Sequence, residues 1–176
     1  MLPIEFEGRR ACCFTGHRPA RLPDHGRSAS PEMERLLYLL RHGIESAVRM
    51  GVTTFLTGGA EGFDTIAAES VLLLKRQYHP QLRLLLALPS KTQAATYSPG
   101  MQARYAGILA AANDVYYASE TDNGAQALLS RNRYLVDHAD CCIAYLKNMS
   151  GGTLYTVNYA LNKGIPVYNL ALCDKS

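Results

Sequence analysis

The chain has 176 residues, of which 48% are hydrophobic and 19% charged, so it is long enough to bury a core and is not expected to be disordered. Its formal net charge of +3 is too small to favour nucleic acid by bulk attraction, and no apolar run approaches the ~20 residues that cross a bilayer. The first ten residues carry acids and no long apolar segment, so no signal peptide is indicated and a cytoplasmic protein is expected, with one domain over residues 1–176.

The first half of the chain alternates short apolar runs with longer helical patterns. Ser30-Pro31-Glu32 has the signature of a helix start, with an N-cap serine, a proline at the first helical position and an acid in the first turn. The leucine-rich run over residues 82–88 is typical of a strand covered on both faces. The predicted elements are a strand over 10–15, a helix from Ser30 to Gly51, a strand over 53–57, a helix over 63–78 and a strand over 82–88.

The second half repeats this alternation and completes the fold prediction. Leu154, Val157 and Leu161 recur at helical spacing and predict one buried face for the last long helix, which Gly164 ends. Six strands with intervening helices predict a doubly wound α/β sheet of mainly parallel strands with helices on both faces. The predicted elements are a helix over 98–112, a strand over 114–118, a helix capped by Thr121 or Asp122 and reaching His138, a strand over 140–146, a helix over 153–163 and a strand over 165–170.

The five cysteines are interpreted as small, reduced core residues. Cys12-Cys13 and Cys141-Cys142 lie in strand-like runs, and adjacent residues of a strand point to opposite faces, so neither pair resembles a CxxC metal motif. The histidines have no metal-ligand spacing either. No metal and no cofactor are therefore expected, and the thiols fit a cytoplasmic compartment.

Glycine turns follow two of the predicted strands. Gly58-Gly59-Ala60-Glu61-Gly62 separates an apolar run from a helical pattern, and Gly151-Gly152-Thr153 opens the last long helix. Glycines let the backbone approach a ligand closely, and the free amides of a helix N-terminus suit an anion. In such sheets ligands bind beyond the carboxyl ends of the strands, where the loop Gly16-His17-Arg18 is also expected. The pattern predicts a nucleotide pocket, and a tight turn without a ligand is the alternative.

Four motifs in sequence order carry a resemblance to a known family. They are Phe14-Thr15-Gly16-His17-Arg18-Pro19, Gly58-Gly59-Ala60-Glu61-Gly62-Phe63-Asp64 with Ala67-Ala68-Glu69, Arg131-Asn132-Arg133-Tyr134 with Val136-Asp137, and Gly151-Gly152-Thr153. Over residues 10–170 the chain resembles the YpsA-like family of the SLOG superfamily, which also groups DprA/Smf and the LOG enzymes. The resemblance implies a Rossmann-like fold, a nucleotide-related ligand and a homodimer.

The resemblance extends only in part to the LOG phosphoribohydrolases, which cut the N-glycosidic bond of a nucleoside monophosphate. Arg131 is similar in position to an arginine of their signature, and Gly152-Thr153 resembles the GT of their PGGxGTxxE motif. The glutamate of that motif would fall at Thr156, which cannot serve as an acid or a carboxylate. A carboxylate favours the oxocarbenium-like transition state of glycosidic cleavage, so this departure argues against the same hydrolase chemistry.

Asp64 and His17 are the candidates for a replacement catalytic group. Asp64 opens a predicted helix and is interpreted as a helix cap, with a ribose contact or catalysis as the alternatives. His17 is either a general acid/base or only a polar group of its loop. Glu69 is expected to lie too far from the glycine turn to act, and Asp137 is expected to form a helix-end salt bridge.

Arg18 and Arg131 are the cations expected at the ligand, because a guanidinium matches phosphate oxygens. Arg133 is expected to point away from Arg131, since positions two apart on a helix diverge by about 200°. Arg21 and Lys91 are interpreted as solvated surface charges.

Three functions remain open from the sequence. The first is binding of a nucleotide or nucleotide-derived ligand, as a sensor or a sequestering module. The second is a nucleotide N-glycosidase that uses a non-standard acid, and the third is single-stranded DNA binding, which needs a basic stripe. The expected partner is a nucleotide-like small molecule, neither nucleic acid nor a membrane. The predicted ligand-binding residues are Gly16, His17, Arg18, Gly58, Gly59, Gly62, Asp64, Arg131, Asn132, Gly151, Gly152 and Thr153.

Overall fold

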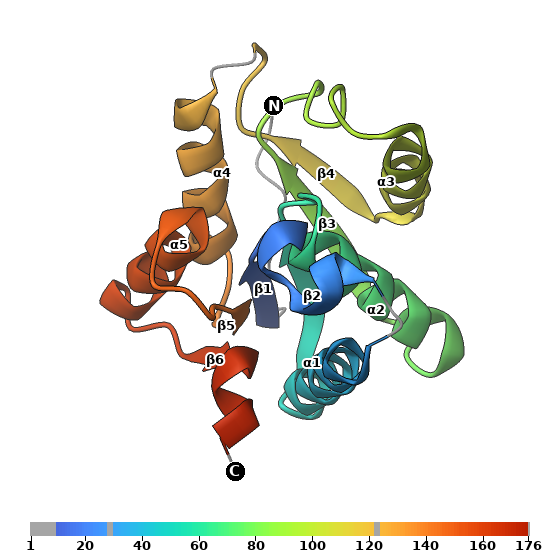
Figure 1. Ribbon diagram of the computed structural model, residues 1–176, viewed down its shortest axis with the longest axis vertical. Coiled ribbons are helices and arrows are strands. Elements are labelled where there is room, and N and C mark those ends of the chain that lie inside the picture. Colours follow the sequence, from blue (N-terminus) through green and yellow to red (C-terminus); the bar gives the residue numbers. More distant parts are fainter. Residues whose placement is uncertain (1–9, 28–29, 122–123, 176) are drawn as a thin grey trace.

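The computed structural model describes residues 10–27, 30–121 and 124–175. In this part of the chain a six-stranded sheet lies at the centre, with strand order β4-β3-β2-β1-β5-β6 (Figure 1). All pairs of neighbouring strands are parallel, which confirms the predicted α/β class. The strands are β1 (Arg10–Gly16), β2 (Val52–Thr57), β3 (Arg83–Leu88), β4 (Asp114–Tyr117), β5 (Cys141–Tyr145) and β6 (Val167–Asn169).

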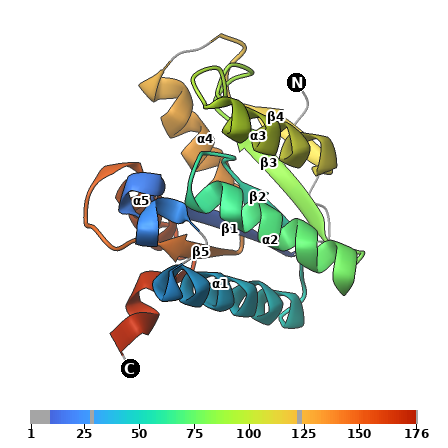
Figure 2. The same cartoon turned by 45° about the vertical axis from the view of Figure 1, so that its right-hand side comes forward.

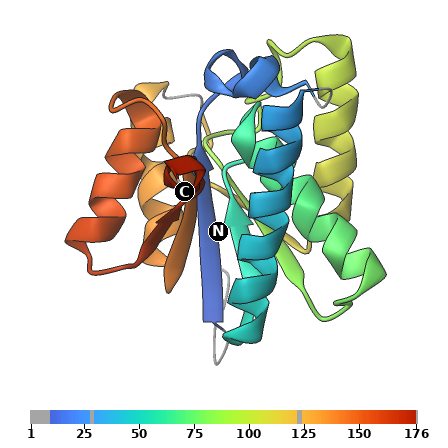
Figure 3. The ribbon, with the colours of Figure 1, turned by 60° about the horizontal axis from the view of Figure 1, so that its bottom comes forward.

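Two layers of helices cover the sheet, one on each face (Figure 3). One layer holds α1 (Pro31–Arg49), α2 (Phe63–Gln77) and α3 (Pro99–Ala111), and the other holds α4 (Ala125–Asp137) and α5 (Gly151–Asn162). In the first layer α1 and α2 lie side by side, and α3 packs beyond α2 (Figure 2). The doubly wound arrangement predicted from the alternation of strands and helices is therefore confirmed.

The strands are buried on both faces because successive side chains enter opposite cores. On β1, Cys12 and Phe14 join the hydrophobic cluster under α1–α3, whereas Cys13 joins the cluster under α4 and α5. On β3, Leu84 and Leu85 divide between the two clusters in the same way. This two-sided burial explains why the strands appear in the sequence as continuous apolar runs.

Several element boundaries differ from the predictions. The first helix of the second layer, α4, begins at Ala125 with Gly124 as its N-cap, so Thr121 does not cap it, and Asp122 lies outside the described residues. The last long helix begins at Gly151, before the predicted Thr153. β6 spans only Val167–Asn169, because the chain turns into the 3-10 helix η3 (Leu170–Lys175).

The predicted buried face of α5 is also partly wrong. Leu161 is 55% exposed, and the buried residues of this helix are Thr156, Val157 and Ala160. Ala160 is fully buried, so the face of α5 that meets the sheet is rotated away from Leu161. The helical spacing of apolar residues predicts a helix, but it does not determine which of two neighbouring rows of residues on that helix faces the sheet.

The strand order reverses between β1 and β5. The chain leaves β1 towards β2, β3 and β4 on one side, whereas β5 and β6 are added on the other side. Such a switch point opens a crevice at the carboxyl ends of the two strands. The loop after β1 crosses this edge through two short 3-10 helices, η1 (Pro19–Arg21) and η2 (Pro23–Gly26) (Figure 3). Among the described helices, none has both the length and the apolar character needed to cross a membrane.

Candidate functional site

A pocket of about 410 Å³ opens at the carboxyl edge of the sheet. The end of β1, the start of α2, one side of α4 and the start of α5 contribute to its lining, so four segments far apart in the sequence meet there. The predicted site residues in the lining are Gly16, Arg18, Asp64, Arg131, Asn132, Gly152 and Thr153. Five others lie beside the lining rather than in it, namely His17, Gly58, Gly59, Gly62 and Gly151.

Arg131 links α4 to the glycine turn after β2. Its side chain is 5% exposed, and its Nη1 donates a hydrogen bond of 2.5 Å to the carbonyl oxygen of Gly58. Its Nε donates to Oδ1 of Asn132 at 2.8 Å. A Cβ on Gly58 would lie 1.8 Å from Nη1, so a glycine is required at this close approach. The first glycine of the turn therefore makes room for a buried guanidinium.

Asp64 lies on the same wall of the pocket, in the first turn of α2. It is 7% exposed, and burial raises the pKa of its carboxyl, an effect opposed by the positive charges of Arg131 and Arg18. Burial likewise lowers the pKa of Arg131, and Asp64 opposes that change. Two opposite charges are thus held out of water beside one cavity, where electrostatic interactions are stronger than at the surface.

The N-cap of α2 is Gly62, so Asp64 does not occupy the capping position. Its carboxylate is instead favoured by backbone N–H groups of Gly58 and Ala60, which lower the pKa of Asp64. Gly62 has φ 106°, and a Cβ there would lie 2.6 Å from the carbonyl oxygen of His17. The turn after β2 therefore packs closely against the loop after β1 at Gly62.

His17 joins the loops that follow β1 and β5. Its ring is 3% exposed, and its Nε2 accepts hydrogen bonds from the backbone N–H groups of Lys147 (3.0 Å) and Asn148 (3.1 Å). Burial and the charge of Arg21 lower the pKa of His17. An imidazole that accepts two N–H bonds at Nε2 is neutral, so this side chain positions the β5 loop.

The helices that open onto the pocket begin without side-chain caps. The N-caps of α2, α4 and α5 are Gly62, Gly124 and Ser150, and none makes a side-chain cap bond. By contrast, Ser30 Oγ accepts a bond from the first turn of α1, and Ser98 Oγ does so at α3. The start of α5 therefore presents backbone N–H groups and the positive end of the helix dipole to the pocket side.

Arg21 lies at this helix start, although the sequence suggested only a solvated charge. Its Nη1 donates to Oγ of Ser150 at 3.0 Å and lies close to Gly151. Its side chain is exposed, so it remains accessible to a bound anion. The signal available in the sequence was that Arg21 shares the long loop after β1 with Arg18. Whether Arg18 or Arg21 reaches α5 depends on the conformation of η1, which the sequence did not predict.

Apolar residues of α4 form a further part of the pocket lining, on the helix that also carries Arg131. Leu128 and Leu129 line the pocket and are partly exposed, and Leu135 and Ala125 complete this part of the lining. These residues were not predicted from the sequence, because leucines on a helix are usually core residues. Their one distinguishing signal is position, since they lie within one turn of Arg131.

The remaining charged residues of the motifs lie away from the pocket lining. Arg133 points to the exposed side of α4, where its Nε donates to the hydroxyl of Tyr155 at 2.8 Å. Lys163 forms an ion pair with Asp137, as expected for a helix-end carboxylate. The residue at the LOG glutamate position, Thr156, is buried and donates to the carbonyl oxygen of Gly152 at 2.9 Å. Among the described residues, no cluster of three His, Cys, Asp or Glu side chains could hold a metal ion.

The fold and this pocket define a Rossmann-like α/β protein with its candidate site at the switch point. The family model of YpsA, described as the YspA SLOG family, matches residues 12–171. The chain therefore belongs to this family, and the resemblance carried by the four motifs is confirmed.

The curated relatives are less than one third identical to the chain over the aligned residues. The SPbeta prophage-derived protein YoqJ of Bacillus subtilis, described as uncharacterized, is 29% identical over 117 residues, which cover 60% of this chain and 68% of YoqJ. A UPF0398 protein of Shouchella clausii is 29% identical over 132 residues, covering 72% of this chain and 70% of that protein.

Two solved structures of DNA processing protein A (DprA) have the same fold. The protein from Streptococcus pneumoniae superposes with a TM-score of 0.61 at 17% identity, and the match covers 90% of this chain but 49% of that one. The Helicobacter pylori protein, whose description concerns its single-stranded DNA binding mode, gives a TM-score of 0.59 at 18% identity, covering 90% and 63%. The chain thus spans about half the length of the pneumococcal protein, and the likeness establishes the fold.

Proposed function

We propose that this protein binds a nucleotide or a nucleotide-derived small molecule in the pocket at the carboxyl edge of the sheet. The observation that carries the proposal is the buried wall formed by Arg131 and Asp64, which meet across Gly58 beside a cavity of about 410 Å³. A volume of this order suits a small ligand. Buried opposite charges at a cavity are also typical of binding and catalytic sites.

The anionic part of the ligand would lie at the start of α5. Gly152 and Thr153 in the first turn of this helix line the pocket, and the helix has no side-chain cap. Arg18 lines the same pocket, and Arg21 contacts the residue that precedes the helix. Free amides, a helix dipole and two guanidinium groups together favour a phosphate.

The other walls suit the remaining parts of a nucleotide. Asp64 can accept hydrogen bonds from ribose hydroxyls, as the acidic residue of dinucleotide-binding folds does. Leu128 and Leu129 of α4 offer an apolar surface to a base. These three kinds of wall surround one cavity, which favours a compound that combines phosphate, sugar and base.

The test is calorimetric titration of the purified protein with nucleoside monophosphates and NAD-type dinucleotides. We expect saturable binding of at least one of them, weakened about tenfold or more by Arg18→Ala, because a hydrogen bond to a charged group contributes about 1.5–3 kcal/mol. The side chain of Arg18 is exposed and makes no hydrogen bond among the described residues, and Arg18→Ala keeps the backbone carbonyl that accepts from the Arg21 N–H, so the substitution should not affect folding. Lys91→Ala is the matched control, an exposed cation after β3 that does not line the pocket.

The same titration separates this function from its two alternatives. Release of free base from a nucleoside monophosphate, abolished by Asp64→Asn, would instead support a glycosidase, which the raised pKa of the buried Asp64 favours as a general acid. Binding of an oligothymidine that nucleotides do not compete for would support single-stranded DNA binding. No binding by any member of the nucleotide panel, or equal binding by the Arg18→Ala variant, would contradict the proposal.

We further propose that the protein acts in the cytoplasm. Its five cysteines are all free, and four of them are buried on the adjacent strands β1 and β5. Reduced thiols are typical of that compartment. The homodimer implied by the family resemblance stays a prediction, which the molar mass in solution would test.

A further inference from the structure

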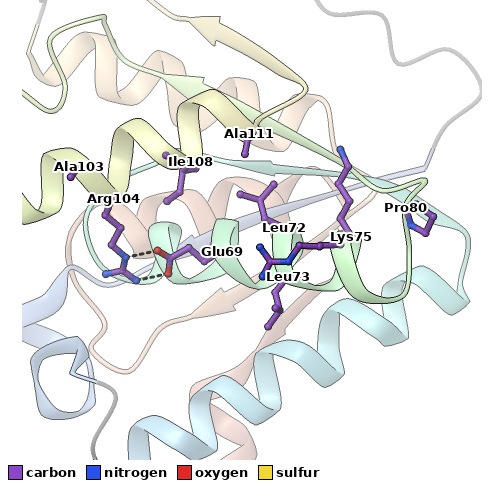
Figure 4. Close-up of a pocket in the computed structure, with 11 residues that line it drawn as sticks. Glu69, Leu72, Leu73, Lys75, Pro80, Ala103, Arg104, Ile108 and Ala111 are labelled. Carbon is purple, nitrogen blue, oxygen red and sulfur yellow. Dashed lines mark hydrogen bonds and ion pairs between the residues drawn. The ribbon is translucent and has the colours of Figure 1, made fainter.

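A groove runs along α2 on the outer side of the helical layer that contains α1 and α3. It consists of a cleft of about 870 Å³ between α2 and α3 and a cleft of about 550 Å³ between α1 and α2. The two clefts adjoin at Glu69, Leu73 and Arg104, which line both. Figure 4 shows these three residues in the larger cleft. No residue that lines this α2 groove lines the candidate ligand pocket, so the groove is a separate feature of the surface.

The groove is open because α3 carries small residues where it faces α2. Ala103, Gly107 and Ala111 are spaced four residues apart and therefore lie along one side of the helix. A Cβ added at Gly107 would meet no atom within 4 Å. Leu72 and Leu73 of α2 remain only partly buried beneath this gap. The floor of the groove is therefore apolar and uncovered.

Cationic side chains outnumber carboxylates along the groove. Five Lys or Arg residues and one carboxylate, Glu69, line the two clefts, whereas the whole chain has a formal net charge of +3. The positive charge of the protein is thus concentrated on this surface. The cations are Arg27, Arg41, Lys75, Arg76 and Arg104.

Most of this positive charge is not neutralised within the protein. Glu69 forms an ion pair with Arg104, whose Nε donates to Oε1 of Glu69 at 2.5 Å (Figure 4). Within the described part of the chain, the side chains of Arg27, Arg41 and Arg76 have no hydrogen-bond or ion-pair partner, and all three are exposed. Three free guanidinium groups therefore surround an apolar floor.

This combination fits an acidic amphipathic helix better than other occupants. The 15 residues of α2 are about 22 Å long, which matches a partner helix of about four turns. Such a helix places its apolar face in the groove and its acids against the rim. A second copy docking through a two-fold axis would set the same positive patch against itself. No aromatic side chain is among the described residues of the lining, so nucleic acid bases would find no stacking platform.

We propose that the α2 groove is a docking surface for an acidic amphipathic helix of a partner protein. The partner's apolar side chains lie over Leu72, Leu73 and the small residues of α3. Its carboxylates pair with Arg41 and Arg76 on either side. The surface is independent of the ligand pocket, so either can exist without the other.

The experiment uses a designed probe and the full chain. The probe is an 18-residue peptide with leucines at i, i+3, i+4 and i+7 and glutamates elsewhere, labelled for fluorescence anisotropy. We expect it to bind in the micromolar range and to protect amides of α2 and α3 from hydrogen exchange. A peptide with lysines in place of the glutamates should bind at least tenfold more weakly, since it would meet the cations with like charge.

Gly107→Leu is the most direct variant, because a Cβ there meets no atom within 4 Å and the leucine side chain would extend into the cleft that Gly107 lines. Leucine also favours a helix more than glycine does, so the variant should fold at least as well as the natural protein. We expect its affinity for the acidic peptide to fall at least tenfold. Gly100→Leu is the matched control, since Gly100 lies on the same helix in open space but outside the cleft lining, and its affinity should change less than twofold.

Charge reversal tests the rim separately from the floor. Arg41→Glu combined with Arg76→Glu should weaken the acidic peptide at least tenfold, whereas Arg49→Glu, an exposed arginine of α1 outside the groove, should change it less than twofold. The proposal is overturned if the peptide fails to bind at millimolar concentration or if binding survives both Gly107→Leu and the double reversal. It is also overturned if oligothymidine binds the groove and displaces the peptide, which would assign the surface to nucleic acid.

Discussion

Gly58 is the residue on which the buried wall of the pocket depends. Arg131 reaches its carbonyl oxygen, and a Cβ would lie 1.8 Å from Nη1 of Arg131 and 2.8 Å from Oδ2 of Asp64. A methyl group at this position must therefore displace two buried charged groups at once. The constraint is steric, because the conflict arises from side-chain atoms of other elements.

Gly58→Ala should accordingly destabilise the protein by about 1–3 kcal/mol, the usual cost of overpacking. It should also abolish ligand binding in the pocket, because Arg131 can no longer hold its position. Urea denaturation measures the first effect and calorimetric titration the second. Gly100→Ala, where a Cβ meets nothing within 4 Å, is the control and should be neutral or slightly stabilising. Wild-type stability and binding in Gly58→Ala would show that the Arg131 contact is dispensable.

His17 makes the stability of the protein depend on pH. Burial and Arg21 lower its pKa below the ordinary value of 6.5, so the unfolded chain binds a proton that the folded chain resists. The stability it contributes is therefore complete above about pH 6.5 and is lost as the pH falls below that value through the folded-state pKa. Protonation also removes the acceptor for the Lys147 and Asn148 amides.

His17→Gln should reduce this pH dependence, because a glutamine carbonyl accepts the same N–H groups without titrating. Urea midpoints at pH 7.5 and pH 5.5 measure the effect for both proteins. We expect the loss of stability between these two conditions to be smaller in the variant. An equal loss in both proteins would exclude His17 as the cause.

At the scale of elements, the helices divide by how they begin. α1 and α3 are capped by Ser30 and Ser98, whereas the three helices that open onto the pocket have no side-chain cap. At α5 the hydroxyl of Ser150 is directed to Arg21 instead. An uncapped start leaves amides available for a ligand at a cost to the stability of the helix.

Serine-to-alanine variants test this division directly. Ser30→Ala removes the acceptor of the Met33 amide, at 3.2 Å, and should cost about 1 kcal/mol. Ser150→Ala removes no cap bond and should change the free energy of unfolding by less than about 0.5 kcal/mol. Urea denaturation of both variants measures the difference. Equal costs would mean that Ser150 caps α5 in solution.

Local sequence signals predicted most elements of this fold. The serine-proline starts of α1 and α3 have a direct chemical signature, and the apolar runs of the strands follow from burial on both faces. The start of α4 has no such signature, since Gly124 caps it through backbone conformation alone. The prediction therefore placed the start of α4 too early, at Thr121 or Asp122.

The candidate site was predicted less completely than the fold. Glycine turns and Arg131 were found because both follow from motif and position, and the structure brings them together at one edge. Arg21 was missed, since its approach to Ser150 depends on the fold of the loop after β1. Leu128 and Leu129 were missed because an apolar residue of a pocket wall has the same sequence signature as a core residue.

At the scale of the whole molecule, the paired strands β1 and β5 contribute side chains to both hydrophobic clusters. Cys12 is in register with Cys141, and Cys13 with Cys142, so four cysteines lie side by side on two adjacent strands. Cys12 and Cys13 belong to different hydrophobic clusters, one under each helical layer. Exposing all four thiols therefore requires both layers to leave the sheet.

Thiol labelling should consequently report the cooperative unfolding of the whole molecule. With iodoacetamide under native conditions and mass spectrometry to locate the label, Cys173 should react first, because it is the exposed cysteine. Cys141 should follow, since it is 6% exposed and its contact with Cys12 lowers its pKa. Cys12, Cys13 and Cys142 are fully buried and should react together, at a rate that rises with urea as global unfolding does. Labelling of Cys13 before Cys12 would instead show that the layer of α4 and α5 opens on its own, and the two cores would then be separate cooperative units.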